Sequence, residues 1–214
     1  MMQQPTHVSY LFDPFCEWCY GASATLKRIQ NLENITLELC PSGLYAETGK
    51  HPVDRHFATY SWHNCKRIEQ LTGRVFSEKY RHILENSESP FDSSQAILAL
   101  TAVNICEPKR ALEALINIQE ARFIHGLDVT KKKVLVEIMR EYRFTDAIRR
   151  FVDEDNELLI LNASTTIVTQ NRMRNLLIQG APHLVVTRGH HQRVINGSYL
   201  YLNTRELFDY LKYD

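Results

Sequence analysis

The chain has 214 residues and no net formal charge, because 25 basic side chains balance 25 acidic ones. This balance excludes a global field that would recruit nucleic acid or anionic lipid. Hydrophobic residues make up 44% of the chain and charged residues 23%, as in ordinary globular proteins, and no apolar run reaches the roughly 18–20 residues that span a bilayer. The first seven residues lack the basic and apolar regions of a secretory signal, so we expect a cytosolic protein.

The first elements predict a strand–helix–strand unit. Residues 7–12 mix β-branched and aromatic side chains and predict a strand, which Pro14 ends because the residue before a proline avoids the helical region. A helix is predicted from Glu17 to Gln30, and a second strand over 35–39. This spacing implies parallel pairing of the two strands with a right-handed crossover.

The middle of the chain, from about residue 53 to 179, has an almost entirely helical pattern. Gly73 and Gly126 stand where helices end, and Asp92 stands where one begins. The predicted helices cover 54–71 and 93–105, begin at Pro108, after Thr130 and after Thr145, and end with a long segment over 156–179. We therefore predict a compact helical block.

The end of the chain returns to strand patterns. Residues 184–187 predict a strand, residues 188–192 a turn and residues 193–197 a partner strand, which together make a hairpin. Thr204 is placed to cap a last helix. The predicted fold class is α/β, in the order β-α-β, helical block, α-β-β-α.

A Cys-x-x-Cys pair, Cys16 and Cys19, lies where the first helix begins. Unpaired backbone N–H groups and the positive end of the helix dipole favour a thiolate there. Cys16, at the exposed start of the helix, is the expected attacking thiol, and Cys19, one turn inside, the expected resolving thiol. Zinc sites use the same spacing, and an inert pair is a third interpretation. Redox chemistry is favoured, because no second Cys-x-x-Cys or His-x-x-x-His supplies further metal ligands.

Two motifs at opposite ends of the chain resemble the DsbA family of thioredoxin-fold proteins, and most closely its FrnE-like branch. The first is DPFCEWCYG over 13–21, and the second is Gly180-Ala181-Pro182 before an apolar strand. The resemblance implies a thioredoxin-like fold interrupted by an all-helical insertion. The expected domains are 1–55 plus 165–214 for the thioredoxin-like part and 56–164 for the insertion.

The resemblance also implies roles for particular residues. Cys16 would be the nucleophilic thiol, Cys19 the resolving thiol, and Pro182 a cis-proline facing them. Ala181 would offer backbone groups to an extended substrate strand, and it replaces the commoner Val or Thr. The implied function is a cytosolic thiol–disulfide oxidoreductase or isomerase that works through a mixed disulfide. It would need no cofactor beyond its redox-active disulfide, with glutathione as a candidate co-substrate. Its partners would be proteins or small molecules bearing disulfides or thiols, and a recycling reductant or oxidant.

Neighbouring side chains complete the predicted site. The charge of Glu17 opposes thiolate formation at Cys16, and the histidine of DsbA is absent, which predicts a less oxidising couple. Trp18 is expected to cover the thiols, and Glu17, Trp18 and His183 are the candidate substrate contacts. His183 is either a proton shuttle near the thiols or points away into the sheet, and Asp13 is expected to cap the loop. The single cysteines are expected to be buried hydrophobic side chains: Cys40, Cys65 and Cys106.

Two alternative functions belong to other classes. Glutathione-dependent transferases and isomerases of the kappa and hydroxychromene-carboxylate isomerase types share the inserted helical domain, but typically carry serine where Cys16 stands. A non-catalytic, chaperone-like module would instead use an apolar groove near Pro182.

Overall fold

A four-stranded mixed sheet forms the centre of the molecule in the computed structural model, which describes residues 5–87 and 89–213. The strand order is β2-β1-β3-β4. β1 pairs parallel with β2, whereas β3 runs antiparallel to both β1 and β4. The strands are β1 (Thr6–Phe12), β2 (Ile35–Pro41), β3 (His183–Arg188) and β4 (His191–Asn196). The parallel β1–β2 pair and the β3–β4 hairpin therefore agree with the sequence pattern.

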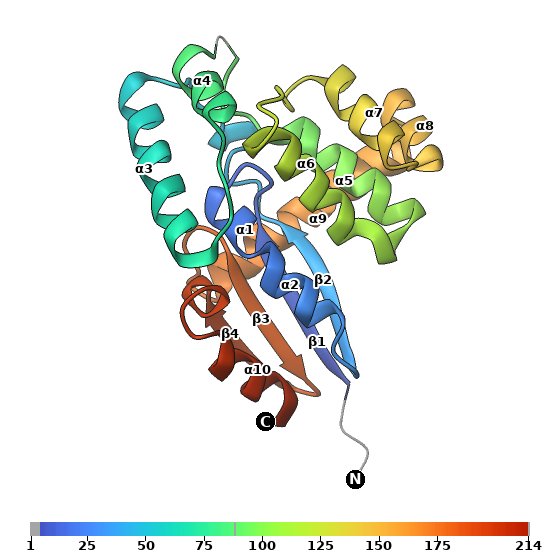
Figure 1. Cartoon of the computed structure of the whole chain (residues 1–214). Helices are drawn as coiled ribbons and strands as arrows, with labels where there is room; N and C mark the ends of the chain where they lie inside the picture. The colour runs from blue at the N-terminus through green and yellow to red at the C-terminus, as the bar shows by residue number, and fades with distance from the viewer. Residues whose placement is uncertain (1–4, 88, 214) are drawn as a thin grey trace.

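Helices cover both faces of this sheet (Figure 1). In front of it lie α1 (Glu17–Gly21), α2 (Ser23–Gln30) and α10 (Thr204–Tyr213), and behind it lies α9 (Asn156–Asn175). Side chains of β1 alternate accordingly: Tyr10 joins the large core beneath α1 and α2, whereas Leu11 packs with Met173 and Leu176 at the end of α9. Both faces of β1 are thus buried, whereas β4 at the edge of the sheet is mostly exposed.

The predicted helix from Glu17 to Gln30 is wrong in one respect, because it breaks at Ala22 into α1 and α2. The hydroxyl of Ser23 donates to the Tyr20 carbonyl at 2.6 Å and takes the acceptor that a continuous helix would use. Gly21 lets α1 approach α3 (Arg55–Thr72) closely, since a Cβ there would lie 2.7 Å from Cγ2 of Ile68.

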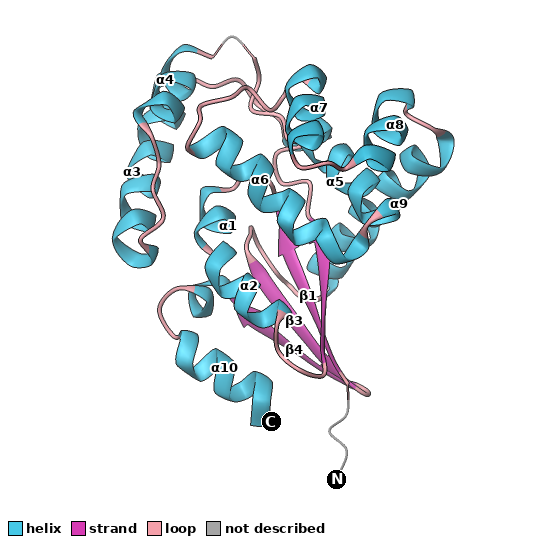
Figure 2. Cartoon of the chain, turned by 45° about the vertical axis from the view of Figure 1, so that its right-hand side comes forward, coloured by secondary structure: helices cyan, strands magenta, loops and turns pink. Residues whose placement is uncertain are grey.

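The helical insertion gathers above the carboxyl ends of β1 and β2 (Figure 2). Helix α4 (Glu78–Asn86) was not predicted as a separate helix. Asp54 accepts from the Phe57 amide at the start of α3, and left-handed Gly73 ends that helix, as predicted. The insertion contains α3 (Arg55–Thr72), α4 (Glu78–Asn86), α5 (Ser94–Cys106), α6 (Ala111–Phe123), α7 (Lys132–Glu141) and α8 (Thr145–Asp153).

The insertion and the sheet share one continuous hydrophobic core, so they are not separated by a layer of solvent. The last helix of the block, α9, contacts α5 near its start and β2 near its end, and it crosses the predicted domain boundary at residue 165. It ends at Asn175 rather than Gln179, since Leu177 is left-handed, with φ of 55°. The exact domain division stays a prediction. Within the described residues, no helix is both long enough and apolar enough to cross a membrane.

Candidate active site

The two cysteines of the Cys-x-x-Cys motif lie at the start of α1. Cys16 is the N-cap residue, and its amide donates to the Asp13 carbonyl at 3.1 Å, which closes the turn that leaves β1. Both thiols are free, and both residues are buried, with Cys16 3% and Cys19 1% exposed. The expectation of an exposed Cys16 is therefore wrong, because residues from the far end of the chain cover it.

One of those covering residues is Ala181, which precedes Pro182. The Ala181–Pro182 peptide bond is cis, and the Cys16 thiol lies 3.5 Å from the Ala181 carbonyl oxygen, to which it donates. Gly197 makes room for this loop, because a Cβ at that position would lie 2.2 Å from the Pro182 carbonyl oxygen. The chain thus brings together two segments that are 165 positions apart.

The surroundings of Cys16 disfavour its thiolate form. A hydrogen bond with the Cys19 sulfur, burial, and the charges of Cys19 and Glu17 raise the pKa of Cys16 well above its usual value. The backbone N–H of Cys19 opposes this effect, as expected at a helix N-terminus. Burial and the neighbouring charges therefore raise the pKa of Cys16 by more than the helix N-terminus lowers it.

Glu17, between the two cysteines, is buried and its carboxyl is bound by the helical insertion, so its contact with substrate stays a prediction. Its Oε1 accepts the hydroxyl of Ser61 from α3 and the hydroxyl of Tyr80 from α4, the latter at 3.0 Å. Burial raises the pKa of Glu17, and these two hydrogen bonds oppose the rise. The carboxyl therefore joins the thiol motif to the helical insertion.

Asp13 is the second buried carboxyl beneath the thiols, and it organises the loop as predicted. Its Oδ1 accepts the Phe15 amide at 2.9 Å, and its Oδ2 accepts the Tyr45 amide at 3.1 Å and the Ser93 hydroxyl at 2.9 Å. Complete burial raises the pKa of Asp13 to about 6 in spite of these three donors.

A buried arginine from the insertion, Arg122 of α6, accompanies the two carboxyls. It is 3% exposed, and its guanidinium lies 4.0 Å from the centre of the Phe15 ring and 4.9 Å from that of Phe91. Its positive charge lowers the pKa of both Asp13 and Glu17. The sequence did not indicate this residue, because an arginine two positions after Glu120 on a helix gives no local sign that it is buried.

Trp18 lies on the more open side of the motif and is partly exposed, as predicted for a cover. The Tyr201 hydroxyl donates to the Trp18 carbonyl at 2.5 Å, and the guanidinium of exposed Arg67 lies 5.7 Å from the indole ring. On the inner side, the Tyr10 hydroxyl donates to the Cys19 carbonyl at 3.2 Å.

His183 lies on the other face of the sheet from α1. Along β3 it alternates with Leu184 and faces the same way as Val185, which packs on the α9 side. Burial lowers its pKa. This placement agrees with the alternative in which the imidazole points away from the thiols. Cys40 and Cys65 are buried as expected, whereas Cys106 is only partly buried.

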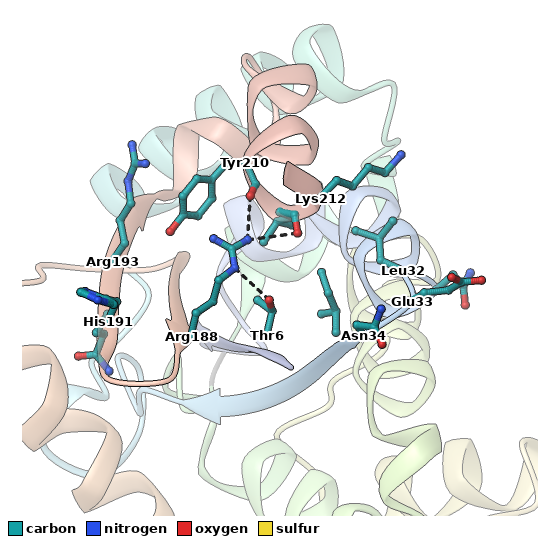
Figure 3. Close-up of a pocket in the computed structure, with 13 residues that line it drawn as sticks. Thr6, Leu32, Glu33, Asn34, Arg188, His191, Arg193, Tyr210 and Lys212 are labelled. Atoms are coloured by element: carbon teal, nitrogen blue, oxygen red, sulfur yellow. Dashed lines mark hydrogen bonds between the residues drawn. The ribbon is translucent and has the colours of Figure 1, made fainter. Parts of the chain in front are cut away.

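The sheet also borders a pocket of about 910 Å³, far from the thiols (Figure 3). Its lining includes Thr6, where β1 begins, and Arg188, where β3 ends. Cys16 follows the opposite end of β1, and Pro182 precedes the opposite end of β3. Arg188 crosses the pocket to donate to Thr6 Oγ1 and to the backbone carbonyls of Tyr210 and Leu211, so it joins β1 to α10. In the described residues, no three His, Cys, Asp or Glu side chains gather as a metal site.

Solved structures share this fold over nearly the whole chain. The cytosolic disulfide reductase DsbM from Pseudomonas aeruginosa is 25% identical over 96% of this chain and 98% of its own, with a TM-score of 0.83. The chain has the fold of the DsbA- and DsbM-type thiol–disulfide oxidoreductases. A second DsbM structure, with GSH, has a TM-score of 0.79 at 25% identity, covering 96% of this chain and 98% of that one.

A solved structure with lower sequence identity has the same fold. The oxidoreductase DsbA from Xylella fastidiosa is 13% identical, covers 97% of this chain and 84% of its own, and has a TM-score of 0.58. No protein-family profile and no curated protein sequence matches the chain. The predicted fold class, a thioredoxin-like α/β fold with a helical insertion, is confirmed.

Proposed function

We propose that this protein is a thiol–disulfide oxidoreductase that reduces disulfides through Cys16 and Cys19. The observation that carries the proposal is the placement of the Cys16 thiol at the N-terminus of α1, 3.5 Å from the carbonyl that precedes the cis-proline. The similarity to a cytosolic disulfide reductase over nearly the whole chain supports the same class of reaction.

The exchange proceeds in two displacements. Cys16 loses its proton, and the resulting thiolate attacks one sulfur of the substrate disulfide, which forms a mixed disulfide and releases a substrate thiolate that takes up a proton. Cys19 then loses its proton and attacks Cys16, which forms the Cys16–Cys19 disulfide and releases the second substrate thiol. Two electrons pass to the substrate, and two thiols of a recycling reductant restore the pair. The backbone at Ala181 pairs with an extended substrate segment during this exchange.

The raised pKa of Cys16 supports the reducing direction. Strongly oxidising members of this class stabilise their reduced form as a thiolate. Here a raised pKa of Cys16, to which Glu17 contributes, removes that stabilisation, so the reduced dithiol is the better electron donor. Glutathione is the recycling thiol that we favour, because a DsbM structure contains GSH. The substrates are protein disulfides or mixed disulfides with small thiols.

The test is reduction of insulin and of a glutathionylated peptide, with glutathione as reductant. We expect Cys16→Ser to abolish both reactions and Cys19→Ser to accumulate a mixed disulfide that mass spectrometry detects. Cys106→Ser, which changes a partly buried cysteine away from the motif, is the matched control and should keep full activity. Activity in a Cys16→Ser/Cys19→Ser double variant would overturn the proposal and favour a glutathione transferase or isomerase.

A further inference from the structure

Apolar side chains are exposed along the outer face of α9, the helix behind the sheet. Ile160 is 68% exposed, Val168 63%, Ile167 55% and Leu161 38%. The helix buries only Leu158 and Thr169 fully, on its opposite side. Contiguous exposed apolar surface of this kind marks an interaction site more often than scattered single residues do.

The pattern of this face is symmetric about its middle. Leu161 and Ile167 lie three positions on either side of Ser164, and Ile160 and Val168 lie four positions on either side. Ala163 and Ser164, both exposed, are small enough to let another helix approach closely at the centre. If a second α9 crosses antiparallel at Ser164, Ile160 of each copy meets Val168 of the other.

The two ends of α9 carry opposite charge. Asp153, Asp155 and Glu157 cluster near its start, where Arg150 pairs with Asp155 and Glu157. Its last turn holds two basic residues, exposed Arg174 and partly buried Arg172, whose guanidinium donates to the Ser9 hydroxyl of β1, and residues 170–180 contain no acid. This distribution of charge is favourable with the dipole of α9 itself. In an antiparallel pair, the acidic start of each α9 would also face the basic end of the other, which is favourable at both ends. The helix dipole does not explain why apolar side chains are exposed in the middle of α9.

We propose that the outer face of α9 binds a second copy of this chain, in an antiparallel α9–α9 contact with its two-fold axis near Ser164. A self-complementary surface with opposite charges at its ends is what an isologous dimer requires. The contact lies behind the sheet, on the face away from α1, so it does not cover the helix that carries Cys16 and Cys19 (Figure 1). The proposal is independent of the function proposed above.

Sedimentation velocity over a concentration series tests the dimer. We expect wild type to sediment as a dimer, and Val168→Glu to be monomeric with unchanged circular dichroism and disulfide exchange. Val75→Glu is the matched control, because Val75 is 59% exposed but lies outside α9, and it should remain dimeric. A monomeric wild type at every concentration, or a dimer that survives Val168→Glu, would overturn the proposal.

Cysteine crosslinking tests the geometry. An oxidant should join two copies of Ser164→Cys into a covalent dimer, because the axis passes beside that position. Arg174→Cys should stay uncrosslinked, since ten residues of helix on each side separate the two thiols by about 30 Å. Wild type without an added cysteine controls for the native thiols. Crosslinking of Arg174→Cys as efficient as that of Ser164→Cys would contradict an antiparallel contact.

Discussion

The thioredoxin-like part and the helical insertion contribute different things to the same site. The former supplies the reacting groups, which are the two thiols and the Ala181–Pro182 loop. The insertion supplies the surroundings of the two buried carboxyls: Ser61 and Tyr80 at Glu17, Ser93 at Asp13, and the positive charge of Arg122 near both. The insertion is therefore part of the electrostatics of the thiols as well as a surface above them.

Of the changes considered, removing Arg122 should have the largest effect on stability. Arg122→Leu leaves two buried carboxyls without their nearest positive charge, so we expect the free energy of unfolding to fall by about 3 kcal/mol at pH 7. The loss should shrink at pH 5, where more of the carboxyls are protonated. Urea denaturation at both pH values measures this. Arg67→Leu, at an exposed position, is the control, and an equal loss in both variants would contradict the expected role.

Asp13 predicts the next largest effect, as a dependence of stability on pH. Its pKa of about 6 in the folded chain exceeds the unfolded value, so between these values the folded state binds more protons. The contribution of Asp13 is then favourable at low pH and declines by about 3 kcal/mol as the pH rises from about 4 to about 6. Glu17 acts with the same sign. Asp13→Asn should flatten the slope of unfolding free energy against pH, and an unchanged slope would exclude Asp13 as its source.

Glu17→Gln tests the link between the insertion and the thiols with the smallest change in shape. Glutamine keeps an oxygen for the Ser61 and Tyr80 hydroxyls but removes the negative charge beside Cys16. The pKa of Cys16 should fall, and alkylation by iodoacetamide at pH 7 should quicken about tenfold for each pKa unit. Glu78→Gln, at the exposed start of α4, is the matched control. A rate equal to wild type would show that burial alone sets the state of the thiol.

The order of elements could be predicted from local patterns. β-branched and aromatic side chains identified β1, and a turn between two strand-like segments identified the hairpin. Asp54 and Gly73 correctly marked the ends of α3, because capping depends on nearby residues. The break at Ala22 was missed because it depends on the Ser23 hydroxyl competing for a carbonyl. Helix α4 was also not identified separately.

Part of the candidate site could be predicted, and the rest could not. The Cys-x-x-Cys motif and the Gly-Ala-Pro segment were identified because the chemistry of their residues is distinctive. Ser61, Tyr80 and Arg122 were missed, since hydroxyls and a single arginine on helices are common and nothing local indicates what they face. For the same reason the two hydroxyl partners of Glu17 were not predicted.

By itself, the sequence determined the chemistry available to this protein: two sulfurs three positions apart, at the start of a helix that follows a strand. Only the tertiary structure decided the state of those sulfurs. A hydrogen bond with Cys19, burial, and the charges of Cys19 and Glu17 raise the pKa of Cys16 by more than the helix end lowers it. The physical reason is that burial depends on how distant segments pack around the thiol, and Ala181, 165 positions away, is in contact with it.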